Sequence, residues 1–162
     1  MSRLVPIIAI TCMLLGCGPD VQEQAARTYV TEMTPLLEDN HRLARTLLQL
    51  AEKIKYHRTT PQKVADQFDK ELIPAARSLA ERAQTIQPSE APLNGIHQDL
   101  VRAWSNRQKA YVAMHAAWVD GDLAAYEAKA ESHKTVFKAE ARYFKNVNNT
   151  LAEYQLTLEQ YP

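Results

Sequence analysis

The sequence predicts an all-α protein that folds as an antiparallel up-down-up-down four-helix bundle with long first and fourth helices. Glycine is scarce, at 4 of 162 residues, whereas alanine, leucine, glutamine, glutamate, lysine and arginine are abundant, and this is the composition of helices. After residue 20, apolar residues recur at steps of three and four, which is the spacing of a helix seam. Prolines, a glycine and capping residues divide this region into four segments, and we expect no sheet.

The first helix is predicted to begin at Val21 and to end near Tyr56. Asp20 can cap it, and Glu23 three residues later completes a capping-box pattern. Pro35 lies inside the segment, where its missing N–H and its ring are expected to bend the helix or split it into two. The inward row is Val30, Met33, Leu37, Asn40, Ala44, Leu47, Ala51 and Ile54.

The second helix is predicted to start at Thr60, with Pro61 at the first helical position, where a missing N–H donor costs nothing. It stops before Pro88, and we expect Pro74 to interrupt it. Its inward row is Ala65, Phe68, Leu72, Ala75, Leu79, Ala83 and Ile86.

The third helix is predicted to be capped by Ser89 and to close at Asp120-Gly121 through a glycine C-cap. Trp104, Tyr111 and Trp118 are seven residues apart and therefore lie along one face. Such a stripe is more typical of a helix–helix seam than of a ligand-stacking site.

The fourth helix is predicted to run from Asp122 to about Gln160, or about 58 Å at 1.5 Å per residue, whereas the second spans only about 39 Å. Short loops make neighbouring helices antiparallel, so the first and fourth helices should overhang the others at the end where the chain starts. We expect this overhang, from segments 21–30 and 151–161, to form a two-helix stalk.

The first residues have the pattern of a secretory signal. A charged start, Met-Ser-Arg, precedes the apolar run Leu4–Leu15, which is too short to span a bilayer. The run leads into Leu14-Leu15-Gly16-Cys17, which resembles the lipobox of bacterial lipoproteins. This resemblance implies that residues 1–16 are a signal peptide and that Cys17 becomes the lipidated first residue. Residues 17–20 would then be a tether, and residues 21–162 the bundle domain. The alternative is an ordinary signal peptide in which Cys17 carries no lipid.

The cysteine count fits this interpretation. Cys12 would leave with the signal, and a lipidated Cys17 cannot form a disulfide, so the body of the protein must depend on packing alone. A lipid on Cys17 would hold the domain at a membrane surface without crossing it. The predicted location is therefore the cell envelope, facing the periplasm if the host is Gram-negative.

The charges balance, with 19 Lys and Arg against 19 Asp and Glu. So neutral a chain has no broad electrostatic field to attract nucleic acid, and none is expected as a partner.

Polar residues interrupt the apolar rows at four positions: Asn40, Arg107, His133 and Glu140. A count of helix heights from each turn places Asn40, His41, Arg77 and Glu140 at one level, where Arg77 or Arg102 should pair with Glu140 because an unpaired buried charge is costly. The same count places Arg107, His133 and Glu71 at a second level. We interpret both levels as devices that fix helix register, in preference to a ligand pocket.

Residues for catalysis or a cofactor form no convincing motif. Glu38 and His41 match the Glu-x-x-His element of di-iron bundles, but one copy without glutamates from other helices is a weak metal candidate. The sequence has no Gly-x-Ser-x-Gly elbow, no glycine-rich phosphate loop and no Cys-x-x-Cys-His haem motif. We therefore expect no enzyme activity and no cofactor.

Three hypotheses for function follow. The first is a membrane-anchored, non-enzymatic lipoprotein that acts as an interaction or accessory module for an unidentified envelope protein. The second is a sensor or binding bundle for a small ligand, in which Arg77, Arg107, His133 and Glu140 line a pocket between helices. The third is a metal or haem carrier that uses Glu38 and His41.

Overall fold

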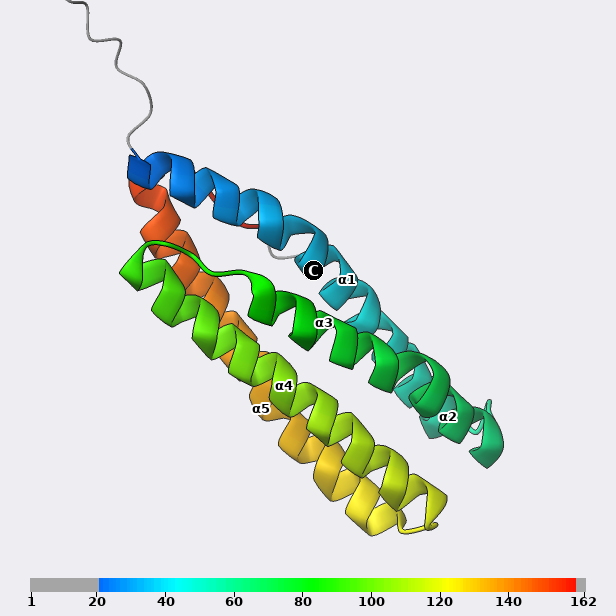
Figure 1. Ribbon diagram of the computed structural model, residues 1–162. Helices are drawn as coiled ribbons and strands as arrows, with labels where there is room; N and C mark the ends of the chain where they lie inside the picture. The colour runs from blue at the N-terminus through cyan, green and yellow to red at the C-terminus, as the bar shows by residue number, and fades with distance from the viewer. Residues whose placement is uncertain (1–20, 160–162) are drawn as a thin grey trace, which may run out of the picture.

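The computed structural model describes residues 21–159, which are helical except for short turns, a linker and one non-helical segment near the C-terminus. The elements are α1 (Val21–Lys55), α2 (Pro61–Gln67), η1 (Phe68–Leu72), α3 (Ile73–Thr85), α4 (Ala91–Val119), α5 (Leu123–Leu151) and η2 (Ala152–Tyr154). Because α2, η1 and α3 follow one another without a break, they form a single rod, and the fold has four rods (Figure 1). The predicted all-α four-helix bundle is confirmed. The predicted signal peptide, tether, Cys17 and Asp20 cap lie outside the described residues.

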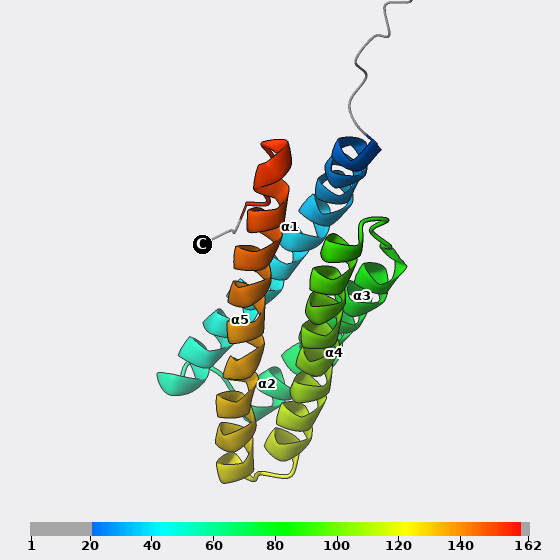
Figure 2. The same ribbon diagram turned by 90° about the vertical axis from the view of Figure 1, so that its left-hand side faces the viewer.

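The rods pack in a definite order. α4 lies along both α5 and α3, and α3 also packs on α1. Figure 2 shows α1 crossing α5 obliquely instead of running along it. The apolar rows meet in one core, which includes Met33, Leu50, Phe68, Leu93 and Trp104. Because α1 crosses α5 obliquely, the seam between these two helices is the least closely packed of the bundle.

The two internal prolines have different effects. Pro35 lies within a continuous α1, so the predicted split is wrong. Buried apolar residues on both sides of it, Met33, Leu36 and Leu37, hold the helix on the core and offset the lost hydrogen bond. The interruption predicted at Pro74 is confirmed, since a π-helical turn precedes it. There the Ile73 N–H bonds to the Phe68 carbonyl, and Pro74 then occupies the first turn of α3.

The helix ends follow the capping signals with one exception. Thr60 accepts a hydrogen bond from the Lys63 N–H at 3.3 Å, and Gly121 adopts a positive φ of 73° after α4. α4, however, begins after Glu90 and not after Ser89. The Glu90 carboxylate makes no side-chain cap and instead accepts hydrogen bonds from the Tyr154 hydroxyl.

The C-terminal segment differs most from the prediction, because α5 ends at Leu151 and not near Gln160. A 3-10 turn follows, Gln155 takes a φ of 58°, and residues 156–159 turn back along α5. The apolar side chain of Leu158 is buried in this way, with 2% exposed. Because Tyr154 joins the end of α5 to the start of α4 through Glu90, the predicted overhang and two-helix stalk are wrong.

Within residues 21–159, no helix is both long enough and apolar enough to cross a membrane.

Candidate functional site

A polar cluster lies in the centre of the bundle and joins three helices. Arg107 of α4, which is 1% exposed, donates hydrogen bonds to Asn40 Oδ1 of α1 and to Glu140 Oε1 of α5. The indole N–H of Trp104 donates to the same Glu140 oxygen at 2.7 Å. Trp104 and Arg107 are three residues apart on α4, so both side chains reach the same height of α5. The positive charge of Arg107 is thereby paired with the negative charge of Glu140 in the core.

The pairing differs from the predicted one. Arg77 is exposed on α3, and Arg102 is exposed on α4, where it pairs with Asp99. The count from the turns compares only the positions of Cα atoms along the bundle. It does not predict the pair of Arg107 with Glu140, because an extended arginine side chain can reach a partner one helical turn away. The first predicted level therefore forms only in part: Asn40 and Glu140 meet, and Arg107 replaces Arg77.

His133 lies close to the cluster on α5 and is 3% exposed. Its ring centroid is 5.1 Å from that of Tyr111 and 5.0 Å from that of Phe137. Burial, and after it the nearby charge of Arg107, lower the pKa of His133 to about 4, so the ring is neutral at pH 7. Two buried atoms, Arg107 Nε and His133 Nε2, find no hydrogen-bond partner among the described residues. The second predicted level also forms in part, since Glu71 is exposed and accepts a hydrogen bond from Gln67.

A second buried cluster was not predicted from the sequence. The hydroxyls of Tyr29 and Tyr143 are 2.8 Å apart, and the Tyr29 hydroxyl lies 3.1 Å from His97 Nδ1. His97 Nε2 lies 2.8 Å from the Ala83 carbonyl, which can only accept, so Nε2 carries the proton and Nδ1 accepts from Tyr29. The hydroxyl of Tyr143 then donates to Tyr29. Burial raises the pKa of both tyrosines and lowers that of His97, which keeps the whole chain of hydrogen bonds uncharged.

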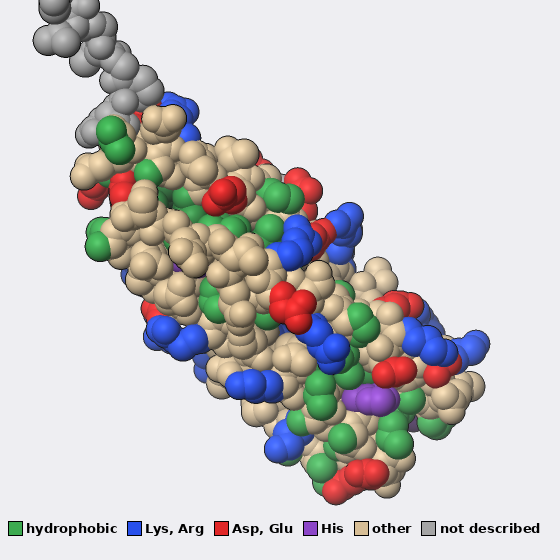
Figure 3. Space-filling view, viewed as in Figure 1, with side chains coloured by type: hydrophobic (Ala, Val, Ile, Leu, Met, Phe, Trp, Pro, Cys, Tyr) green, Lys and Arg blue, Asp and Glu red, His purple; other side chains and the backbone are tan. Residues whose placement is uncertain are grey.

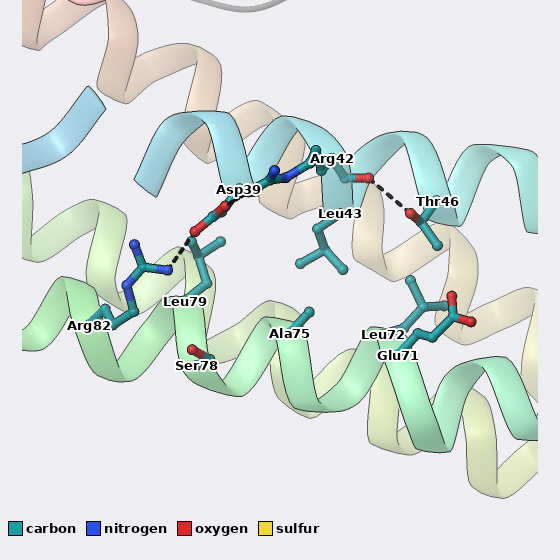
Figure 4. Close-up of a pocket in the computed structure, with 10 residues that line it drawn as sticks. All are labelled: Asp39, Arg42, Leu43, Thr46, Glu71, Leu72, Ala75, Ser78, Leu79 and Arg82. Carbon is teal, nitrogen blue, oxygen red and sulfur yellow. Dashed lines mark hydrogen bonds and ion pairs between the residues drawn. The ribbon is translucent and has the colours of Figure 1, made fainter. Parts of the chain in front are cut away.

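Two of the surface grooves lie along the middle of α1. The groove between α1 and α3 has a volume of about 270 Å³, and Figure 4 shows Asp39 placed between two arginines at its edge. Asp39 accepts hydrogen bonds from Arg82, at 2.5 Å, and from Arg42. These bonds, chiefly the one from Arg82, lower the pKa of the Asp39 carboxyl. Its charge is thus compensated within the chain.

The groove between α1 and α5, with a volume of about 260 Å³, is more apolar. Leu48 of α1 is 60% exposed, and Phe137 of α5 is 38% exposed. Asn40 and Glu140 of the central cluster also line this groove. The complete lining is Leu37, Asn40, His41, Ala44, Arg45, Leu48, Phe137, Glu140, Ala141 and Phe144. The groove therefore combines apolar walls with a polar strip that the cluster fixes in place.

The metal candidates Glu38 and His41 both lie on α1, the first exposed and the second half-buried. Between residues 21 and 159, no group of three or more His, Cys, Asp or Glu side chains is arranged to hold a metal ion.

Comparison with protein-family models, with curated proteins and with solved structures gives no match for this chain.

The arrangement is suited to holding helices together and to binding. The charges of Arg107, Glu140 and Asp39 are each compensated by a partner from another helix. Apolar side chains, in contrast, remain open to solvent along the seam between α1 and α5.

Proposed function

We propose that the protein is a membrane-anchored, non-enzymatic lipoprotein of the cell envelope that acts as a helical interaction module for another envelope protein. The observation that carries the proposal is the groove between α1 and α5. Its walls leave Leu48 60% exposed and Phe137 38% exposed, and burial of this apolar surface by a partner would be favourable. An apolar groove between two helices is a common recognition surface for a polypeptide segment.

The central cluster supports a binding role. Arg107 connects α1, α4 and α5 through its bonds to Asn40 and Glu140, so the two walls of the groove are held at a fixed separation. A groove that is rigid before binding loses less conformational entropy when a partner arrives.

The position of the proposed anchor also agrees with this role. Only residues 18–20 separate Cys17 from the start of α1 at Val21. A lipid on Cys17 would hold the domain by this end, and the groove, which begins at Leu37, would lie beyond it on the side away from the membrane.

The face that α1, α3 and α4 present fits a protein partner better than a polyanion. Figure 3 shows acidic and basic side chains interspersed over the face that α1, α3 and α4 present. A mixed surface of this kind gives no continuous basic track for a phosphate backbone.

A small-ligand sensor is the second candidate, favoured by the two buried atoms without a partner, Arg107 Nε and His133 Nε2. A small molecule that bonded to both would have to enter between α4 and α5. Thermal melts with small anions and amino acids test this candidate, because such a ligand raises the melting temperature of the wild-type protein but not that of Arg107→Met.

The proposed function is tested by crosslinking and affinity purification from cell envelopes. We expect the wild-type protein to be in the membrane fraction and to capture one specific protein. Cys17→Ser should move it to the soluble fraction, and Leu48→Ser should abolish capture while leaving the protein on the membrane. Val119→Ser, which changes an equally exposed apolar residue at the far end of the bundle, is the matched control and should change neither result. Retention of Cys17→Ser on the membrane, or capture that is unaffected by Leu48→Ser, would contradict the proposal.

A further inference from the structure

The C-terminal segment already occupies part of the seam between α1 and α5. After the turn at Gln155, residues 156–159 run back along α5 in a non-helical conformation. Thr157 and Glu159 line a cavity of about 340 Å³ together with Thr34 and Leu37 of α1, so the segment lies between the two helices. Figure 1 shows it passing behind α1.

One side chain of α5 holds the backbone of this segment. Asn148 Oδ1 accepts the Leu158 N–H at 2.7 Å, and Asn148 Nδ2 donates to the Leu158 carbonyl at 3.1 Å. The Leu158 side chain is 2% exposed and belongs to the core. An asparagine amide that bonds the N–H and the carbonyl of one residue recognises a peptide backbone whatever side chain that residue carries. The apolar surroundings of the Leu158 side chain, in contrast, select an aliphatic residue at this position.

The occupied part of the seam continues into the open groove. Leu37 lines both the cavity beside Thr157 and the groove that contains Leu48 and Phe137. A peptide that follows the path of residues 156–159 in the same direction would be held by the two hydrogen bonds of Asn148. It would then continue into the open part of the groove between α1 and α5. There it would cover the exposed side chains of Leu48 and Phe137.

From this arrangement we infer that the seam between α1 and α5 is a binding site for an extended peptide segment of a partner protein, and that residues 156–159 occupy its first part as a built-in ligand. The partner segment carries an aliphatic residue at the Leu158 position and apolar residues after it. It runs antiparallel to α5 and displaces the chain's own segment. This inference rests on the proposed function and specifies the class of its partner.

The test uses a synthetic peptide of residues 154–162 with a fluorescent label at its N-terminus. Added to the mature chain that carries Cys17→Ser, the peptide competes with the attached segment, whose effective concentration is on the order of millimolar. The substitution Leu158→Glu places a charge in these apolar surroundings and releases that segment. We therefore expect fluorescence anisotropy to show binding to Leu158→Glu at least about tenfold tighter than to the protein with Leu158 intact.

The contacts are assigned by further substitutions in the Leu158→Glu protein. Asn148→Ala should weaken peptide binding by about tenfold or more because two hydrogen bonds to the peptide backbone are lost. The neighbouring exposed residue provides the matched control, and Asn149→Ala should leave binding unchanged. Leu48→Ser should weaken the binding only of a longer peptide that carries apolar residues beyond this segment, and Val119→Ser should weaken the binding of neither peptide. A peptide with glutamate at the Leu158 position should not bind.

Folding of each variant is checked by its thermal melt, and Leu158→Ala replaces Leu158→Glu if the charged variant does not fold. Absence of peptide binding to a folded variant with the segment released would overturn the inference. A wild-type dimer in sedimentation that becomes monomeric with Leu158→Glu would also overturn it, because the occupant would then be the segment of a second copy. Since this assay needs neither membrane nor anchor, its failure is distinct from a failure of the Cys17→Ser fractionation that tests the proposed function.

Discussion

Replacement of Arg107 by methionine is expected to destabilise the protein strongly. The side chain of Arg107 is 1% exposed and that of Glu140 is 10% exposed, so water hydrates either charge poorly when the other is removed. Arg107→Met leaves the Glu140 carboxylate in the core with only the Trp104 N–H among its present partners, and removes the donor to Asn40 Oδ1. Breaking a buried pair in this way costs about 3–5 kcal/mol. For a domain of this size, the melting temperature should fall by roughly 10 °C.

The assay is urea unfolding followed by far-UV circular dichroism, with the slope of the transition compared between variants. The double variant Arg107→Met with Glu140→Leu should regain part of the loss because no unpaired charge remains, although the Trp104 N–H and Asn40 Oδ1 then lack their present partners. Arg102→Met is the matched control on the same helix. Arg102 is exposed and its pair with Asp99 is worth less than about 1 kcal/mol. A single Arg107→Met variant as stable as Arg102→Met, or a double variant less stable than the single, would refute the reasoning.

Three further predictions concern the other buried groups and the metal candidates. Tyr29→Phe should lower the free energy of unfolding by about 1–3 kcal/mol in urea unfolding, because His97 Nδ1 is then left buried without a donor; an equal loss with the exposed Tyr56→Phe would contradict this. Since the pKa of His133 is about 4 in the folded protein and about 6.5 when unfolded, the stability that it contributes is present above pH 6.5. That stability is lost as the pH falls toward 4, by an amount on the order of 3 kcal/mol; His133→Leu should flatten the pH dependence, and an unchanged slope would show that other groups cause it. The purified mature protein should be colourless and free of metal by elemental analysis, and a stoichiometric metal that is lost with His41→Asn would restore the metal-carrier hypothesis.

The periodicity of apolar residues was enough to predict the four rods, because helix–helix packing requires that spacing. Local signals such as Thr60-Pro61 and Gly121 also located two of the turns, since capping chemistry acts within a few residues. The C-terminal end was predicted wrongly for a tertiary reason. Leu151, Tyr154 and Leu158 keep helical spacing, but Leu158 reaches an apolar seat only when the chain reverses and Asn148 holds its backbone.

The sequence predicts which residues form the polar cluster, but not which of them are bonded to one another. Asn40, Arg107, His133 and Glu140 stand out in the sequence because each interrupts an apolar row, and all four are buried. Their pairing depends on side-chain reach and on the vertical register of α4 against α5, which a count from the loops does not resolve. No sequence pattern indicates the hydrogen bonds among Tyr29, His97 and Tyr143. A tyrosine fits an apolar helix face, and the partners of its hydroxyl come from distant parts of the chain.

The most direct test of the account is site-specific photo-crosslinking in intact cells. A photoreactive amino acid in place of Leu48 would lie in the groove between α1 and α5, and one in place of Val112 would lie on the exposed side of α4. We predict that the Leu48 position crosslinks to one envelope protein, through an extended segment with an aliphatic residue, and that the Val112 position does not. Equal crosslinking at both positions, or none at Leu48 in protein shown to be on the membrane, would contradict the claim that this protein binds its partner through the groove.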